Sequence, residues 1–439
     1  MQLSRFGEKF TAKSGILELM DDLGKAMAGS EKKYMLGGGN PAHIPAMNAV
    51  WRRRMEEILA NGDEFERMVA NYDTPQGKAS FVVALASLFR AEFGWDVGPE
   101  NIAITNGSQT GFFLLLNLLA GESAVGRRKI LFPLLPEYIG YADQGLDPRD
   151  FVALKPRIEQ IDAHTHKYHI AFDTLDELLA TDPEIGAICV SRPTNPSGNV
   201  LTDAELARLD MTARAAGIPL IVDNAYGTPF PDIIFSDVTP IFNDNTVVSM
   251  SLSKIGLPST RTGIIIAPEP IARAVSAANA IVSLANGSIG QVMVEPLLGN
   301  GELLRLSRDV VRPFYLERST RAQEVVRTSF ADDIPYSLHR CEGSLFLWLW
   351  FKEFPITTKQ LYERLKDQHV IVVPGEYFFF GTEETWEHRD RCIRLNYAHD
   401  PADVKRGIEI IAREVQTVYS GESGVDTMKH GRIHRGGSK

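Results

Sequence analysis

The sequence predicts an α/β protein with a large domain built on a mostly parallel sheet and a smaller α+β domain. In the middle of the chain, short β-branched runs alternate with amphipathic segments, which is typical of parallel strands joined by crossover helices. After about residue 300 the pattern changes to a long charged helical stretch followed by separate strand-like runs. A chain of 439 residues, 44% of them hydrophobic, is long enough for two packed domains.

Six apolar runs are the expected strands of the large sheet. They are residues 102–105 (IAIT), 129–134 (KILFPL), 187–191 (AICVS), 219–223 (PLIVD), 246–251 (TVVSMS) and 263–267 (GIIIA). Helical periodicity falls between several of them, as at residues 77–94 and 202–217. The second of these helices opens with Thr202 and carries Glu205 three residues later, which predicts a capping box.

The change of pattern near residue 300 sets the expected domain boundaries. We expect the large domain at residues 45–300 and the small domain at residues 1–44 together with 301–420. Small-domain strands are expected within SLFLWLWF, HVIVVPG and CIRLNYA, and the first 40 residues are expected to pack with them. The polar, Gly-rich stretch 421–439 is expected to be a flexible tail.

Composition excludes several classes of protein. A net charge of -10 disfavours binding to nucleic acid or to an anionic membrane. No apolar run is long enough to span a bilayer, and the N-terminus lacks the apolar core of a secretory signal. Three widely spaced cysteines, Cys189, Cys341 and Cys392, fit a reducing compartment, so we expect a cytoplasmic protein without disulfides.

A histidine-rich run, HTHKYH at residues 164–169, is a weak candidate for a metal site. We favour an exposed surface strand instead, because His164 and His166 alternate with polar residues. We therefore expect no metal.

Polar residues follow four of the expected strands. Because ligands of open α/β sheets bind beyond the carboxyl ends of the strands, these residues are expected at one site. Each motif alone is explained by a helix cap or a turn, so the prediction depends on their convergence. The residues are Gly107, Ser108 and Gln109 at a helix N-terminus, Asn195 in a Pro-flanked turn, Asp223 and Tyr226 around the end of a strand, and Ser251, Lys254 and Arg261.

This set matches what pyridoxal phosphate requires of a protein: an amine for a Schiff base, a carboxylate opposite the pyridinium nitrogen, and donors for the phosphate. Lys254 would supply the amine and Asp223 the carboxylate, while Tyr226 and Asn195 can donate to the phenolate oxygen. The phosphate would be bound by the helix N-terminus, where residues 107–109 lie, together with Ser108, Ser251 and Arg261. Once freed, the lysine amine is expected to act as the base at Cα of the substrate.

An ordered series of motifs then identifies a family resemblance. Tyr72, Pro75 and Gly77 are followed by NGSQTG, PEY, NPSG, DNAY, SLSK with its downstream arginine, and IRLNYA. The series resembles the fold-type I, class I and II aminotransferases over nearly the whole chain. The resemblance implies a mostly parallel seven-stranded sheet, pyridoxal phosphate as cofactor, ping-pong transfer between amino acids and 2-oxo acids, and a homodimer with shared active sites.

The resemblance also implies roles for individual residues. Tyr72 would reach the phosphate of the neighbouring subunit, and Tyr138 would stack on the cofactor ring. Arg394 would bind the substrate α-carboxylate beside Asn195, and Gly39 would belong to the segment that closes over the substrate. The lysine and the phosphate arginine are seven residues apart instead of the family's usual eight, so their loop must turn more tightly.

Neutral substrates are expected, because residues 278–291 contain no second arginine for a distal carboxylate. The segments LGGGNPAHIPAM, ANYDTPQGKASF and SLSKIGLPSTRTGIIIA resemble family members that act on valine or alanine with pyruvate or 3-methyl-2-oxobutanoate, in amino acid biosynthesis. Three hypotheses stay open beside this one: an aminotransferase for other neutral or aromatic amino acids, a pyridoxal phosphate-dependent β-lyase, and a ligand-sensing regulator. The last would need a basic DNA-binding segment, for which the N-terminus has no room.

Overall fold

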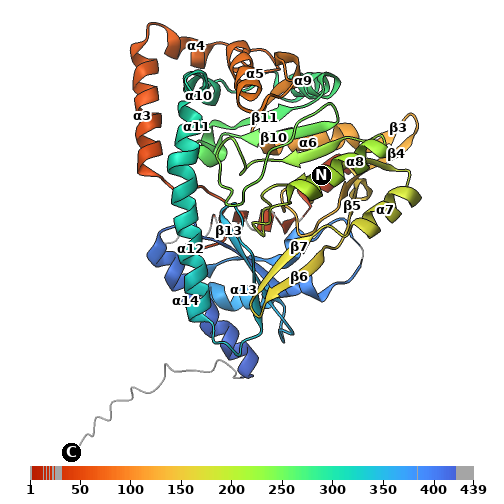
Figure 1. The fold of residues 1–439 in the computed structure, drawn as a ribbon, viewed down its shortest axis with the longest axis vertical. Helices are drawn as coiled ribbons and strands as arrows, with labels where there is room; N and C mark the ends of the chain where they lie inside the picture. Colours follow the sequence, from red (N-terminus) through yellow and green to blue (C-terminus); the bar gives the residue numbers. More distant parts are fainter. Residues whose placement is uncertain are drawn as a thin grey trace, which may run out of the picture.

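The computed structural model describes residues 2–12, 14, 15, 17, 18, 20, 21, 24, 32–382 and 384–421. These residues form two main sheets with helices around them, one in the upper and one in the lower part of Figure 1. The predicted flexible tail lies outside the described residues from position 422 onwards. No helix in the described part of the chain is long and apolar enough to cross a bilayer.

The large sheet contains all six predicted runs. Its strand order is β2-β11-β10-β9-β8-β4-β3, and β5 also pairs with β4. The pairs joining β5, β4, β8, β9 and β10 are parallel, while β11 runs antiparallel to both its neighbours. The strands are β2 (Ile102–Asn106), β3 (Gly121–Ser123), β4 (Gly126–Phe132), β5 (Phe151–Ala153), β8 (Ile185–Ser191), β9 (Leu220–Asp223), β10 (Thr246–Ser251) and β11 (Thr262–Ile266).

The sheet has eight strands instead of the expected seven. The difference comes from a hairpin in which β3 folds back antiparallel on the start of β4. All six residues of β10 are buried, as expected for a strand covered by helices on both faces.

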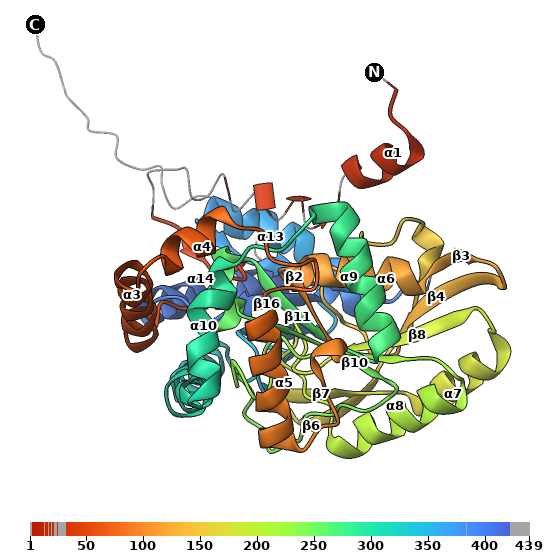
Figure 2. The same cartoon turned by 90° about the horizontal axis from the view of Figure 1, so that it is seen from above.

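The described helices around this sheet include those predicted at residues 77–94 and 202–217. They are α1 (Arg5–Thr11), α3 (Pro45–Ala60), α4 (Glu64–Ala70), α5 (Ala79–Phe93), α6 (Ser108–Leu119), α7 (Phe172–Thr181), α8 (Asp203–Ala215), α9 (Glu269–Ser283) and α10 (Ile289–Gly299). Seen from above (Figure 2), α3 and α4 lie towards one end of the sheet and α7 and α8 towards the other. The predicted capping box of α8 is confirmed, since Glu205 N donates to Thr202 Oγ1 at 3.1 Å and Thr202 N donates to the Glu205 carboxylate at 2.9 Å.

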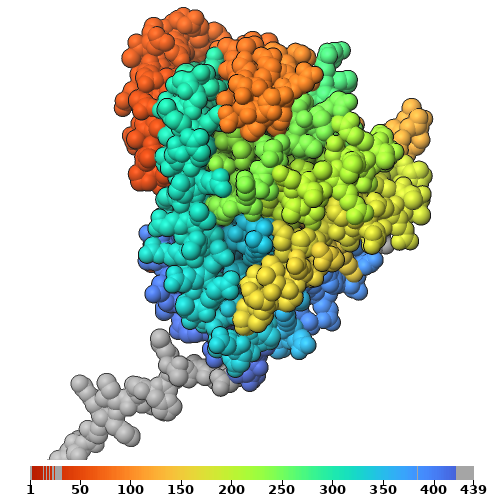
Figure 3. All heavy atoms as spheres, in the orientation of Figure 1, coloured from red at the N-terminus to blue at the C-terminus, as the bar shows by residue number. Residues whose placement is uncertain are grey.

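The second sheet has the order β15-β16-β13-β12-β7-β6. Its strands are β6 (Arg157–Asp162), β7 (Thr165–His169), β12 (Tyr336–His339), β13 (Phe346–Phe351), β15 (Val373–Pro374) and β16 (Cys392–Asn396), and beside it β1 (Tyr34–Met35) pairs in parallel with β14 (Val370–Ile371). The helices are α11 (Glu302–Leu306), α12 (Arg312–Ser329), α13 (Thr358–Asp367) and α14 (Pro401–Ser420), and a π-helical turn, Ser307–Val311, joins α11 to α12. In Figure 3 the teal surface of residues 302–329 runs from the upper to the lower part of the molecule.

One hairpin lies where its sequence did not place it. Strands β6 and β7 fall inside the range 45–300, yet β7 pairs with β12 in the second sheet. The prediction that HTHKYH is an exposed surface strand is wrong, because His166 is fully buried and packs against Tyr168, His339 and Trp350. The partner strand β12 lies about 170 positions further along the chain, so no local sequence pattern around residues 164–169 could indicate the burial of His166. Among the described residues, no group of three or more His, Cys, Asp or Glu side chains is arranged to hold a metal.

Candidate active site

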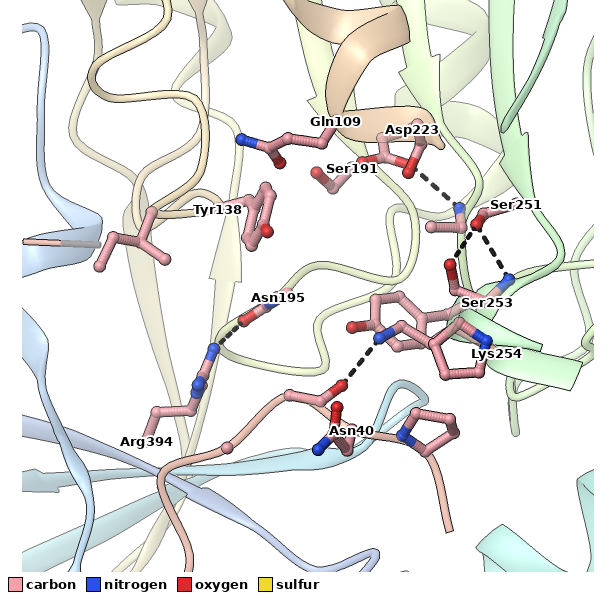
Figure 4. Close-up of a pocket in the computed structure, with 18 of the residues that line it drawn as sticks. Asn40, Gln109, Tyr138, Ser191, Asn195, Asp223, Ser251, Ser253, Lys254 and Arg394 are labelled. Atoms are coloured by element: carbon pink, nitrogen blue, oxygen red, sulfur yellow. Dashed lines mark hydrogen bonds between the residues drawn. The ribbon is translucent and has the colours of Figure 1, made fainter. Parts of the chain in front are cut away.

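A cavity of about 680 Å³ lies beyond the carboxyl ends of the large-sheet strands. Its wall combines these strand ends with the N-terminal segment around Gly39 and with β16, which brings Arg394 in from the second sheet (Figure 4). The structure thus brings together most of the predicted site residues: Gly39, Ser108, Gln109, Tyr138, Asn195, Asp223, Tyr226, Ser251, Lys254, Arg261 and Arg394.

Asp223 ends β9 and is held by two donors. Tyr141 donates its hydroxyl proton to Oδ2, and the backbone N–H of Ala225 donates to Oδ1 at 3.0 Å. Burial raises the pKa of Asp223 to about 6, and these hydrogen bonds oppose the rise. Tyr141 was not among the predicted residues, although its place three positions after Tyr138 in PEYIGY was a usable signal.

Lys254 lies in a short 3-10 turn, Ser253–Ile255, directly after β10. Its Nζ donates to the carbonyl oxygen of Gly39 at 2.8 Å and lies 5.4 Å from the centre of the Tyr226 ring. Burial, followed by the nearby guanidinium groups of Arg394 and Arg261, lowers the pKa of Lys254 to about 8. About a tenth of the amine is therefore uncharged at pH 7, far more than for an ordinary lysine, and this fraction can act as a nucleophile or base.

The N-terminus of α6 and Arg261 form a cradle for an anion. Gly107 has φ +83° and precedes the helix, and a Cβ at this position would overlap the Arg261 guanidinium. The loop between Lys254 and Arg261 makes the tighter turn that their seven-residue spacing requires. It contains a second 3-10 turn, Pro258–Thr260, and Arg261 then adopts φ +48°. Free N–H groups, a serine hydroxyl and a guanidinium meeting at one point are suited to a phosphate.

Arg394 is a buried cation between two aromatic rings. Its guanidinium carbon lies 4.1 Å from the centre of the Phe346 ring and 5.2 Å from that of Phe378. The group donates to Asn195 Oδ1 at 2.8 Å and to the carbonyl oxygen of Gly37 at 2.7 Å, while its buried Nε has no hydrogen-bond partner among the described residues. Burial lowers the pKa of Arg394 to about 10, so it keeps its charge at neutral pH and fits an anionic ligand.

The N-terminal glycine segment connects the two sides of the cavity. Three successive carbonyl oxygens of this segment accept hydrogen bonds. Gly37 O accepts from Arg394 and Gly39 O from Lys254, and Gly38 O between them accepts from Asn396 at 2.6 Å. Asn396 was missed from the sequence, although it belongs to the IRLNYA motif. The segment therefore contacts both the amine and the guanidinium of the site.

Of three other predicted residues, Tyr138 and Gln109 lie at the cavity and Tyr72 does not. Tyr138 lines the cavity, and Gly140 leaves room for its ring, because a Cβ there would overlap it. Gln109 donates to the carbonyl oxygen of Gly140 at 3.1 Å, which ties α6 to the Tyr138 turn. Tyr72 does not join the site: it is 84% exposed and lies outside the cavity of its own chain.

The donor set fits pyridoxal phosphate. The cavity presents an amine of lowered pKa for the aldehyde, a buried carboxylate for the ring nitrogen, an aromatic ring for the face of the cofactor and an anion cradle for the phosphate. The second anion site, at Arg394, remains for a carboxylate of the substrate.

Comparison with known proteins agrees with this geometry. The family model of aminotransferase class I and II matches residues 43–411. The chain is 48% identical to valine–pyruvate aminotransferase of Escherichia coli K12 over 96% of this chain and 99% of that protein, as the three sequence segments predicted.

The similar solved structures are also aminotransferases. The valine–pyruvate aminotransferase of Salmonella typhimurium LT2 superimposes with a TM-score of 0.84 at 46% identity, covering 92% of this chain and 99% of that one. A Psychrobacter arcticum 273-4 protein assigned as an amino-acid aminotransferase gives a TM-score of 0.93 at 42% identity, covering 96% and 100%. An aspartate aminotransferase of Thermus thermophilus, at 20% identity and a TM-score of 0.74 over 94% and 100%, shares the fold.

Proposed function

The chain belongs to the class I and II aminotransferases, which use pyridoxal phosphate, and from this premise we propose that it exchanges an amino group between valine or alanine and the 2-oxo acids pyruvate or 3-methyl-2-oxobutanoate. The observation that carries the choice of substrate is the identity of 48%, over almost the whole of both chains, to a valine–pyruvate aminotransferase. The cavity supports a neutral substrate independently.

The cations that line the cavity are all assigned by the proposal. Lys254 attaches the cofactor, Arg261 binds its phosphate and Arg394 binds the α-carboxylate, and no other lysine or arginine lines the cavity in the described part of the chain. The remaining wall includes apolar groups such as Met35 and Ile139. A carboxylate at the end of the substrate side chain would thus be desolvated without a lysine or arginine to pair with, which disfavours aspartate and glutamate.

The reaction follows from the placement of three charged groups. When bound, pyridoxal phosphate accepts the electrons released as the Cα–H bond of the substrate breaks. Arg394 and Asn195 hold the α-carboxylate, which places Cα near the amine of Lys254. That amine takes the Cα proton as general base, and its lowered pKa suits this role. Asp223, kept ionised by its two donors, holds the cofactor ring nitrogen in its protonated form.

The other predicted residues hold the cofactor in this proposal. Tyr138 covers the ring face, and Tyr226 and Asn195 donate to the phenolate oxygen. The phosphate is bound at the N-terminus of α6 by Gly107, Ser108 and Gln109, together with Ser251 and Arg261. Ser253 supports this cradle, since its backbone N–H donates to Ser251 Oγ at 3.0 Å.

A homodimer with shared sites belongs to the proposal. The segment that contacts the chain just after Tyr72 carries exposed apolar side chains: Val282 is 59% exposed, Leu284 61% and Ile281 88%. Asn279 and Asn286 both donate to the carbonyl oxygen of Pro75 at 3.0 Å, so the two segments form one continuous surface. A second copy covering this surface would bring Tyr72 to the phosphate of its neighbour. The domain boundaries and the cytoplasmic location stay predictions.

A half-reaction tests the proposed function. Single amino acids are added to the purified holoenzyme without any 2-oxo acid, and the absorbance of the bound cofactor is followed as it converts to the pyridoxamine form. Valine and alanine are expected to convert it and aspartate is not. Equal conversion by aspartate would contradict the neutral cavity, and release of ammonia would identify a lyase instead. Lys254→Ala is the control, in which no amino acid converts the cofactor at the normal rate.

A further inference from the structure

A carboxyl group that the proposed mechanism does not use lies directly behind the site. Glu137 precedes Tyr138 and is fully buried. Its Oε1 accepts a hydrogen bond from Ser191 N at 2.8 Å, and its Oε2 lies 2.7 Å from Ser191 Oγ and 3.2 Å from Tyr138 N. Salt bridges within the described residues include none to Glu137. Glu137 does not line the cavity.

Two hydroxyl groups join Glu137 to Asp223. The Ser191 hydroxyl lies 3.4 Å from the hydroxyl of Tyr141, which in turn donates to Asp223 Oδ2. Figure 4 shows Ser191 beside Asp223 at the edge of the cavity. Both hydroxyl residues are buried, with Ser191 3% and Tyr141 0% exposed, so water does not compete freely for these groups.

The direction of the hydrogen bonds depends on one proton. If Glu137 is ionised, the Ser191 hydroxyl must donate to it, and no proton remains for the contact between Ser191 and Tyr141. If Glu137 carries a proton on Oε2, it donates to Ser191, Ser191 donates to Tyr141, and Tyr141 donates to Asp223. Only the second arrangement directs every donor of the chain towards the Asp223 carboxylate.

The charges around Glu137 favour its protonated form. Burial raises the pKa of Glu137 to about 8, the hydrogen bonds from Ser191 and Tyr138 oppose this, and the Asp223 carboxylate raises it further. The other titratable neighbours are the Cys189 thiol and the Tyr141 hydroxyl, and burial raises the pKa of both, so they are uncharged.

We propose that Glu137 is a positioning residue for Asp223: in its uncharged acid form it orients the hydroxyls of Ser191 and Tyr141, and through them it keeps the Asp223 carboxylate ionised and aimed at the cofactor ring nitrogen. This inference rests on the proposed function in one respect: it assumes that the cofactor ring nitrogen lies opposite Asp223. Glu137 touches neither substrate nor cofactor.

Infrared difference spectroscopy of the holoenzyme tests the protonation state without substrate. At pH 7 the spectrum of the wild type minus Glu137→Gln is expected to contain the carbonyl stretch of an uncharged carboxylic acid, sensitive to exchange into D2O. Raising the pH through about 8 should replace this band by carboxylate bands in the wild type only. Carboxylate bands at pH 7 in the difference spectrum would overturn the proposal, even if the enzyme transaminates valine normally.

Cofactor affinity tests the orientation of the chain. Gln can donate to Ser191 as the protonated acid does, and its amide nitrogen loses only the long contact with Tyr138 N, so Glu137→Gln should bind pyridoxal phosphate at pH 7 within about twofold of the wild type. Glu137→Leu removes this donor and also the acceptor of Ser191 N and Tyr138 N, so it should bind at least about fivefold more weakly. A Ser191→Ala background separates the two losses, because it keeps both backbone N–H groups and removes only the hydroxyl. The ratio of the Leu to the Gln dissociation constant should be about fivefold smaller in that background, the equivalent of one neutral hydrogen bond. Equal ratios in the two backgrounds would refute the proposed chain.

Discussion

Replacing Arg394 by lysine is the sharpest test of the substrate site. Lysine keeps the positive charge, but its ammonium cannot give two parallel hydrogen bonds to a carboxylate or stack between Phe346 and Phe378 as the planar guanidinium does at 4.1 Å and 5.2 Å. It also cannot serve Asn195 Oδ1, Gly37 O and a substrate together in the same geometry. Losing one or two charge-assisted hydrogen bonds, each about 1.5–3 kcal/mol, lowers kcat/KM by about 100-fold.

The assay for Arg394→Lys is steady-state transamination of valine and alanine with pyruvate. The fall in kcat/KM should be similar for both amino acids, because the α-carboxylate is common to them. The dissociation constant of pyridoxal phosphate should stay unchanged, since Arg394 lies outside the phosphate cradle. A matched control is Arg127→Lys, which alters a buried guanidinium paired with Asp150 at 2.6 Å outside the cavity and should leave kcat/KM unaltered. A decrease of less than about threefold for Arg394→Lys would refute the assignment of the carboxylate site.

Three further predictions concern the cofactor and the fold. Gly107→Ala places a Cβ against the Arg261 guanidinium at φ +83°, so the dissociation constant of pyridoxal phosphate, measured by fluorescence titration, should rise at least about tenfold, and an unchanged constant would exclude this cradle. Because the pKa of Lys254 is lowered to about 8 and only the uncharged amine attacks an aldehyde, stopped-flow absorbance should show covalent attachment to the apoenzyme accelerating up to about pH 8 and levelling off above it; continued acceleration to pH 10 would contradict the lowered value. Lys167→Met removes the buried cation from the Glu342 carboxylate and leaves it only the exposed Arg340, 3.5 Å from Oε1, so the free energy of unfolding in urea should fall by about 3 kcal/mol, whereas an unchanged midpoint would mean that the buried pair is dispensable.

Local sequence patterns were sufficient for the large sheet and for most of the cavity wall. The strands ending at Asp223 and Ser251 are apolar runs buried on both faces, and their functional residues follow at their carboxyl ends. Residues such as Ser108 and Lys254 were therefore placed correctly from strand positions alone. The roles assigned to these residues stay predictions.

Pairing between distant segments could not be predicted in the same way. Tyr141 was missed because its hydroxyl reaches Asp223 across 82 positions: PEYIGY shows a second tyrosine near Tyr138 but does not indicate its partner. Asn396 was missed because its amide reaches back to Gly38 at the other end of the chain. His166 was expected at the surface because its neighbours are polar, but its ring packs against His339 of β12 and Trp350 of β13. In each case the partner is fixed by tertiary packing, which a single local pattern does not encode.

The second sheet also constrains how the chain can be synthesised. Strands β6 and β7 leave the ribosome long before their partner β12, because the remainder of the large sheet and several helices are translated in between. During that interval the edge of β7 lacks its native neighbour and is open to pairing with other nascent chains. A polypeptide terminated near residue 300 would retain this open edge permanently, so the large domain is not a unit that can be expressed simply by cutting the chain at one position.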